Sequence, residues 1–291
     1  MAGNAQSPLI VVGMHRSGTT MVTRLLEQAG LFMGKEKQGD DEALFFLRMN
    51  EWLQKSTGGE WDNPEYMSQL LGHAEYRALV TDYLRSALGS RHLVSYLGLA
   101  KYLRYRSLHK LDFPWGWKDP RNSYSLPMWL DIFPRAKILH IYRNGIDVAQ
   151  SLRVRARQQL ADNATLHEVR KKRGLYWFKH KNTPFTGSLR CLELDYAFQL
   201  WASYTETAIR NLEAASNPSF TVKYEDFLSD PLTWLTRIVE FCELETTDGQ
   251  LAALAGQVRK DRAYAYKAEP ELARFYEGVQ DNPLIRRLGY A

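Results

Sequence analysis

The sequence predicts an α/β fold of three layers, in which helices flank a central, mostly parallel sheet. Two short apolar runs, Pro8–Val12 and Ala136–Tyr142, indicate buried strands. Segments with helical spacing of apolar residues lie between such runs, and strands that alternate with helices typically pair in parallel. The chain has 291 residues, 45% of them hydrophobic, which is enough for a large core. Because no break in composition separates a second domain, we expect a single domain over residues 1–291.

The elements follow in order along the chain. The first strand ends at Gly13, and helical spacing runs from Thr19 to Ala29, where Gly30 stops it. Further strands are expected at residues 115–118, 136–142 and 219–223. Further helices are expected at residues 41–56, 64–89, 95–108, 123–132, 146–158, 194–214, 231–243 and 247–258. Residues 160–190 are polar and basic and contain Pro184 and Gly187, which predicts a loop or lid.

Charge and cysteine content limit the class of partner. The net charge is +5, and residues 151–190 alone hold ten basic and two acidic residues. Such a stretch fits an anionic ligand, a nucleic acid or an acidic macromolecule, and it fits a solvated helix face equally well. The two cysteines, Cys191 and Cys242, lie far apart in the sequence and do not have the spacing of metal ligands. No apolar run approaches the roughly 20 residues that are needed to span a membrane. The N-terminus has no secretory signal pattern, so we expect a cytoplasmic protein with no membrane partner.

A glycine loop between the first strand and the first helix is the main candidate site. Gly13-Met14-His15-Arg16-Ser17-Gly18-Thr19-Thr20 has the G-x-x-x-x-G spacing of a nucleotide-binding loop, whose backbone N–H groups and helix dipole attract an anion. The lysine that a kinase or ATPase needs after the second glycine is Thr19 here. The strand over residues 136–142 is followed by Arg143, where a Mg²⁺ enzyme would use an acidic residue. The pattern therefore predicts a cradle for an anion.

Four segments resemble the family of sulfotransferases that use 3'-phosphoadenosine 5'-phosphosulfate (PAPS), particularly its bacterial members. His15-Arg16-Ser17-Gly18-Thr19-Thr20 is similar to the family's 5'-phosphosulfate loop, and Tyr142–Leu152 resembles its 3'-phosphate motif, with an Arg and a Ser eight residues apart. Two further segments of the family are similar to runs of this sequence. One resembles Lys223-Tyr224-Glu225-Asp226-Phe227 followed by Pro231, and the other, from bacterial members, resembles Trp117-Lys118-Asp119-Pro120-Arg121. The pieces are in family order and span residues 10 to 242. One departure is Gly145, where many members carry Pro.

The resemblance implies a P-loop-like fold and a defined reaction. A sulfuryl group would move from PAPS to a hydroxyl or amine of a carbohydrate, phenol, peptide or small metabolite by in-line displacement. The desulfated product, adenosine 3',5'-bisphosphate (PAP), would be released, and no metal would be required because cationic side chains can stabilise the charge. The residues implied for the donor are His15, Arg16, Ser17, Gly18, Thr19, Thr20, Arg143, Ser151 and Tyr224.

The catalytic groups are less tightly defined by the sequence. Arg16 and Lys118 are candidates to stabilise charge, and the alternative for Lys118 is an ion pair with a nearby carboxylate. The family generally uses a Glu or a His as the base. Glu42 lies eight residues before Asn50, as in bacterial relatives, whereas Glu36 lies twenty residues after Arg16; we favour Glu42 slightly. His15 and His140 are weaker options.

The sequence is also compatible with two other functions. Thr19 and Arg143 argue against a P-loop kinase of small molecules, because such a kinase needs a lysine at the first position and an acidic residue at the second. A non-enzymatic module that binds RNA or another polyanion through residues 151–190 would leave the glycine loop unexplained. We therefore expect a small-molecule or carbohydrate acceptor and no nucleic acid partner.

Overall fold

The central sheet has four strands, all paired in parallel. The computed structural model describes residues 5–291. The strands are β1 (Leu9–Val12), β2 (Gly116–Lys118), β3 (Lys137–Tyr142) and β4 (Ser219–Lys223), in the order β2-β1-β3-β4. Val11 is in register with Lys118 and Val12 with His140. The carboxyl ends of the strands, and hence the residues that follow them, therefore lie at one edge of the sheet, and the predicted α/β architecture is confirmed.

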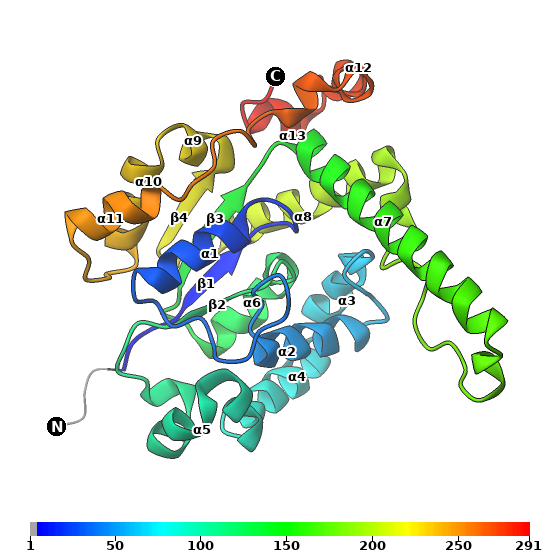
Figure 1. Ribbon diagram of the computed structural model, residues 1–291. Coiled ribbons are helices and arrows are strands. Elements are labelled where there is room, and N and C mark those ends of the chain that lie inside the picture. Colours follow the sequence, from blue (N-terminus) through cyan, green and yellow to red (C-terminus); the bar gives the residue numbers. More distant parts are fainter. Residues whose placement is uncertain (1–4) are drawn as a thin grey trace. The chain divides into compact units, whose positions relative to one another are not determined.

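Helices make up most of the remaining chain (Figure 1). The α-helices are α1 (Thr19–Gln28), α2 (Leu44–Lys55), α3 (Met67–Gly72), α4 (Ala74–Ala87), α5 (Val94–Tyr105), α6 (Asn122–Ile132), α7 (Gly145–Lys172), α8 (Leu194–Ala214), α9 (Tyr224–Ser229), α10 (Pro231–Phe241), α11 (Asp248–Ala255), α12 (Pro270–Val279) and α13 (Pro283–Arg287). Short 3-10 helices are η1 (Pro64–Tyr66), η2 (Arg91–Leu93), η3 (Leu108–Lys110), η4 (Leu175–Trp177), η5 (Arg190–Leu192) and η6 (Ala265–Ala268).

The chain forms two compact units. The first contains the chain up to Arg143 together with Ser203–Ala263, and so holds the whole sheet. The second contains Asn144–Ala202 and Tyr264–Ala291, and so holds α7, the first part of α8, α12 and α13. The expectation of a single sulfotransferase domain over residues 1–291 stays a prediction.

Two cores stabilise the first unit. On one face of the sheet, apolar side chains of β1, β3 and β4 pack against α1, α9, α10 and α11, with Leu26, Ile141 and Phe227 completely buried (Figure 1). A second core is aromatic and joins β2 to α2 and α6. In it, the Phe46 and Trp117 rings stack with centroids 3.9 Å apart, and Trp129 meets Trp117 edge-on at 5.3 Å. Burying this much aromatic surface is a large part of what fixes β2 in the sheet.

The expected loop over residues 160–190 begins later than predicted. Helix α7 does not end near Gln158 but continues to Lys172. The correction has a simple cause, since no Gly or Pro interrupts residues 146–173 and Gly174 is the first residue that readily adopts the left-handed conformation, at φ 62°. Helices α12 and α13 lie beyond the last predicted element. Each begins with a proline at its first position, Pro270 and Pro283, and proline there is a signal for the start of a helix.

Candidate active site

Close packing around both glycines shapes the loop between β1 and α1. A Cβ atom at Gly13 would lie 2.3 Å from the Ile141 carbonyl oxygen, so this turn passes directly over β3. A Cβ atom at Gly18, whose φ is 90°, would lie 2.3 Å from Cδ2 of Tyr224. No side chain larger than hydrogen fits at either position without displacing its neighbour. Tyr224, at the start of α9, therefore lies against the loop, and its role in a donor site stays a prediction.

The loop also offers groups suited to an anion. Helix α1 starts at Thr19 after Gly18, which has no side chain to cap the N–H groups of the first turn. The Ser17 hydroxyl is buried, with 1% of the residue exposed, and has no hydrogen-bond partner within residues 5–291. Arg16 is exposed and adopts φ 68°, a conformation that is rare for residues other than glycine and is concentrated at functional sites. An anion at this helix start would satisfy both the backbone donors and the buried hydroxyl.

Arg143 follows β3 and reaches the same loop. Its guanidinium lies over the Tyr224 ring, 4.8 Å from the ring centroid. It also donates hydrogen bonds to the Arg16 carbonyl at 3.4 Å and to the Arg262 carbonyl at 2.8 Å. Arg143, Tyr224 and the glycine loop therefore form one cationic corner at the carboxyl edge of the sheet, where open parallel sheets bind ligands.

Lys118, at the end of β2, forms a buried ion pair with Glu42. The Lys118 Nζ atom lies 2.6 Å from Glu42 Oε1, and the two side chains are 1% and 6% exposed. The ammonium also donates to the Thr20 hydroxyl at 3.3 Å and to the Asp40 carbonyl. The two leading catalytic candidates are thus in direct contact. The structure thus shows the ion pair between Lys118 and a carboxylate that the sequence analysis gave as the alternative to a charge-stabilising role.

A narrow turn before α2 holds Glu42 in this position. Lys37 and Ala43 form an antiparallel bridge, and the Gln38 N–H donates to the Glu42 carbonyl at 2.9 Å. Asp41 adopts φ 63° at the tip of the turn. The Thr20 hydroxyl donates to the Asp40 carbonyl at 3.0 Å. The turn is therefore tied to the first residues of α1, so the anion cradle and the Glu42 carboxylate are parts of one assembly.

The environment of Glu42 changes its acidity. Burial raises the pKa of the Glu42 carboxyl above its ordinary value, because a charged carboxylate is poorly solvated there. The Lys118 ammonium opposes this shift, while the negative charges of Asp119 and Asp40 add to it. The net direction is upward. A carboxyl with a raised pKa is better suited to accept and hold a proton near neutral pH.

A buried polar network supports the segment that follows Lys118. The Asn50 amide donates to Asp119 and to Asn122, both at 3.0 Å, and Asn122 in turn donates to the Val11 carbonyl at 2.9 Å. The Arg121 guanidinium donates to Asp119 at 3.2 Å. Asp119 and Arg121 therefore have a structural role. The network fixes the end of β2 relative to β1 and so fixes the origin of the Lys118 side chain.

The other predicted residues lie in different surroundings. Glu36 is exposed. The His15 ring is half-buried, with its centroid 5.0 Å from that of Trp61. His140 is buried inside β3, and burial lowers its pKa to about 4, so the ring is neutral at pH 7. The Thr19 side chain packs beneath Gly13. Ser151 lies on α7 in the second unit, and its pairing with Arg143 stays a prediction.

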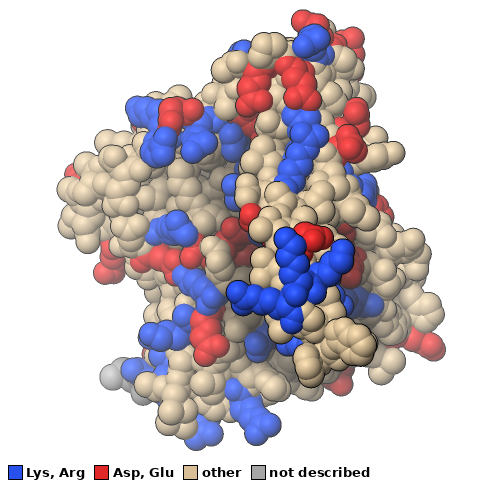
Figure 2. All heavy atoms as spheres, turned by 45° about the vertical axis from the view of Figure 1, so that its right-hand side comes forward, with Lys and Arg blue, Asp and Glu red and all other residues tan. Residues whose placement is uncertain are grey.

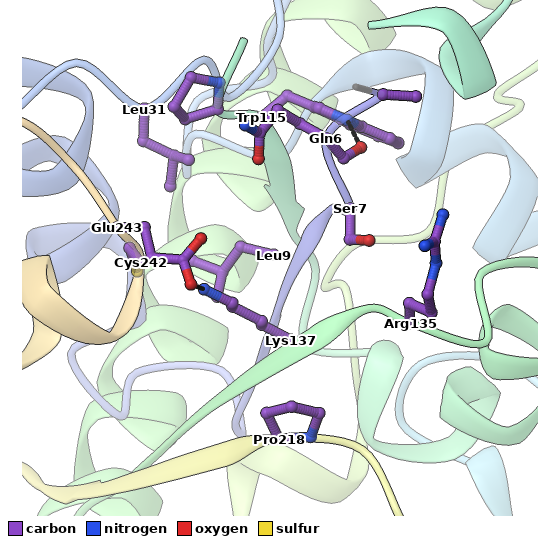
Figure 3. Close-up of a pocket in the computed structure, with 12 residues that line it drawn as sticks. Gln6, Ser7, Leu9, Leu31, Trp115, Arg135, Lys137, Pro218, Cys242 and Glu243 are labelled. Atoms are coloured by element: carbon purple, nitrogen blue, oxygen red, sulfur yellow. Dashed lines mark hydrogen bonds and ion pairs between the residues drawn. The ribbon is translucent and has the colours of Figure 1, made fainter. Parts of the chain in front are cut away.

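A cavity of about 290 Å³ lies at the opposite edge of the sheet (Figure 3). Leu9 and Lys137, which begin β1 and β3, line it together with Pro218 and Glu243, and Lys137 pairs with Glu243 at 2.8 Å. Ligands of open α/β sheets bind at the carboxyl ends of the strands. We therefore place the site at the glycine loop and not in this cavity.

The first unit is thus an α/β structure whose parallel sheet carries a glycine loop and cationic side chains at its carboxyl edge. The chain matches the family model described as "Sulfotransferase family" over residues 8–248, and it belongs to that family. Family membership supports sulfuryl transfer as its general activity. The comparison with curated proteins finds no match.

Solved structures of other proteins are similar to this chain. A sulfotransferase domain from the curacin biosynthetic pathway has a TM-score of 0.50 and 15% identity, over 94% of this chain and 97% of that one. A sulfotransferase from Alicyclobacillus acidocaldarius has a TM-score of 0.46 and 17% identity, over 94% and 91% of the two chains. Of the helices within residues 5–291, none combines the length and apolar character needed to span a bilayer.

Proposed function

We propose that the protein transfers a sulfuryl group from PAPS to a hydroxyl or amine of a small-molecule or carbohydrate acceptor. The single observation that carries this proposal is the cationic corner at the glycine loop. Arg143 stands where a Mg²⁺-dependent P-loop enzyme would place an acidic residue, and it contacts both Tyr224 and the loop backbone. A site built this way favours a donor whose charge is balanced by guanidinium groups and backbone N–H groups.

The proposed roles follow from the positions of the side chains. The α1 N-terminus and the Ser17 hydroxyl would hold the 5'-phosphosulfate, and Arg143 would hold the 3'-phosphate with Ser151 as the proposed second donor. Arg16 would stabilise charge on the transferring group. PAPS supplies the sulfuryl group, and PAP leaves after its transfer.

Glu42 is the proposed general base. Its carboxylate is held on the turn that contacts Thr20, and its raised pKa favours uptake of the acceptor proton. Lys118 fixes the position of the carboxylate through the 2.6 Å contact. In this arrangement Lys118 orients the base, in addition to any contact that it makes with the donor.

Calorimetric titration with PAP in the absence of metal tests the donor site. PAP should bind the wild-type protein, and Arg143→Ala should weaken binding by about 1.5–3 kcal/mol, because a charge-assisted phosphate contact is lost. Arg135→Ala is the matched control, since Arg135 is exposed beside the cavity at the opposite sheet edge.

Titration with ATP and Mg²⁺ separates this proposal from the kinase alternative. Strong binding of ATP–Mg²⁺ with none of PAP would favour a kinase. Equal PAP affinity in Arg143→Ala and in the wild type would remove Arg143 from the site.

A further inference from the structure

The end of α7 and the turn after it form a strongly basic surface. We call residues 166–185 the α7 tip. It contains one carboxylate, Glu168, and six cationic side chains: Arg170, Lys171, Lys172, Arg173, Lys179 and Lys181. Lys and Arg side chains gather at the front of Figure 2, where the end of α7 comes forward. Four of the six, Lys171, Lys172, Arg173 and Lys179, are exposed.

Two large aromatic side chains project from the same tip. Trp177 is 92% exposed and Phe178 is 89% exposed. The other two aromatic residues of the tip are less exposed: Tyr176 is half-buried, with its hydroxyl 3.1 Å from His167 Nδ1, and Phe185 is 37% exposed, with its ring centroid 5.3 Å from that of His167. Trp177 and Phe178 are therefore more than twice as exposed as the other aromatic residues of the tip, which pack against His167.

Backbone hydrogen bonds keep this arrangement in place. The Gly174 N–H donates to the Lys171 carbonyl and the Trp177 N–H to the Gly174 carbonyl, both at 3.1 Å. The Lys179 N–H donates to the Leu175 carbonyl, also at 3.1 Å. The turn is thus closed on both sides of the two exposed aromatic residues, which are presented outward together.

Helix electrostatics explain only part of the charge. Arg170, Lys171 and Lys172 lie in the last turn of α7, where cations interact favourably with the helix dipole. That reason does not apply to Lys179, which lies beyond the helix. Nor does it explain the exposed apolar side chains, which also include Leu166, Val169 and Leu175 at 42–44% exposure. Exposed apolar groups beside cations indicate a surface that meets a partner.

We propose that the α7 tip binds the surface of an anionic lipid membrane. Tryptophan, phenylalanine and leucine enter the interface between headgroups and acyl chains, while lysine and arginine attract anionic headgroups. The exposed aliphatic residues favour a lipid over a nucleic acid, because bases stack on aromatic rings but gain little from leucine and valine. The expectation of no membrane partner depended on the absence of a spanning segment, and peripheral binding needs none.

Co-sedimentation of the full chain with vesicles tests this proposal. The protein should bind vesicles of phosphatidylcholine mixed with phosphatidylglycerol and not vesicles of phosphatidylcholine alone. The double variant Trp177→Ser/Phe178→Ser should bind the mixed vesicles at least about tenfold more weakly, because two aromatic side chains no longer leave water. The triple variant Lys171→Gln/Lys172→Gln/Lys179→Gln should lose about a hundredfold, since each cation contributes about fivefold.

A matched control replaces exposed apolar residues elsewhere. Leu79 and Leu99 are 69% and 62% exposed on α4 and α5, and Leu79→Ser/Leu99→Ser should bind vesicles like the wild type. PAP titration of each variant reports on the donor site separately, so a failure of the proposed donor would not affect the vesicle result.

Three outcomes would overturn the proposal. The first is no sedimentation of the wild type with mixed vesicles at low salt. The second is vesicle binding that Trp177→Ser/Phe178→Ser leaves unchanged. The third is binding of single-stranded RNA, with no vesicle binding, that depends on Trp177 and Phe178, since this would assign the tip to nucleic acid.

Discussion

Breaking the Lys118–Glu42 pair should destabilise the protein strongly. Lys118→Met keeps the length of the side chain but removes its charge and its contacts with Glu42, Thr20 and Asp40. Because both side chains of the pair are at most 6% exposed, water cannot replace the lost partner. Removing one member of a buried ion pair costs about 3–5 kcal/mol. We expect a loss of this size in the free energy of unfolding, measured by urea denaturation at pH 7.

The pH dependence of the loss identifies its cause. In the wild type, burial already raises the pKa of the Glu42 carboxyl in the folded state above its value in the unfolded state. Without the Lys118 charge, the folded-state pKa should rise further, while the unfolded-state pKa stays the same. The folded state then binds the proton more tightly, so raising the pH between these two pKa values favours unfolding, by at most about 1.4 kcal/mol per pH unit. The destabilisation of Lys118→Met should therefore be larger at pH 8 than at pH 5. A cavity alone would give no such dependence.

A double-mutant cycle measures the coupling directly. Lys118→Met/Glu42→Gln removes both charges, and its cost should be smaller than the sum of the two single substitutions by about 1–3 kcal/mol. Arg286→Met is the control, because Arg286 and Asp281 form an ion pair whose side chains are 61% and 81% exposed. Its cost should stay below about 1 kcal/mol. Single substitutions that each cost less than this control, with an additive double variant, would refute the buried pair.

Three further predictions concern the base, the loop and the sheet. Glu42→Gln should abolish turnover while PAP affinity holds, and Glu36→Gln should stay active; the reverse result would make Glu36 the base. Gly18→Ala should weaken PAP binding about tenfold or more, whereas Gly30→Ala, also at positive φ but with nothing within 4 Å, should change it little. The buried His140 stays neutral in the folded state down to about pH 4, so the free energy of unfolding should fall by up to about 3 kcal/mol from pH 6.5 to pH 4. His140→Leu should flatten that decline, and an unchanged slope would contradict the lowered pKa.

Local patterns were sufficient to predict most of the fold. The strand at residues 219–223 and the helix at residues 194–214 have the predicted bounds, since Pro218 and Gly187 mark nearby breaks and the apolar spacing is regular. Helix α7 ends later than predicted because no Gly or Pro interrupts the chain before Gly174, although its second half is polar. Polar residues form long helices when nothing interrupts the backbone.

The contacts within the site depend on residues distant in the sequence. Lys118 and Glu42 are separated by 76 positions, and their pairing depends on the parallel register that places Lys118 beside Val11. The contact of Tyr224 with Gly18 likewise requires β4 to lie beside β3. The partner of each side chain could not be predicted, because it depends on the turn over residues 37–43 and on burial.

Gly145 shows how a departure from the family pattern can be a matter of packing. The sequence departs here from the proline that many members of the family carry, and glycine is the more flexible of the two residues. A Cβ atom at Gly145 would lie 2.5 Å from the Trp201 ring, so the ring occupies the space that a side chain would need. Hydrogen bonds stabilise the conformation of this turn instead, since the Asn144 side chain accepts from the Ile146 and Asp147 N–H groups at 3.0 and 3.3 Å. Asparagine capping therefore defines the start of α7 without the rigidity of proline.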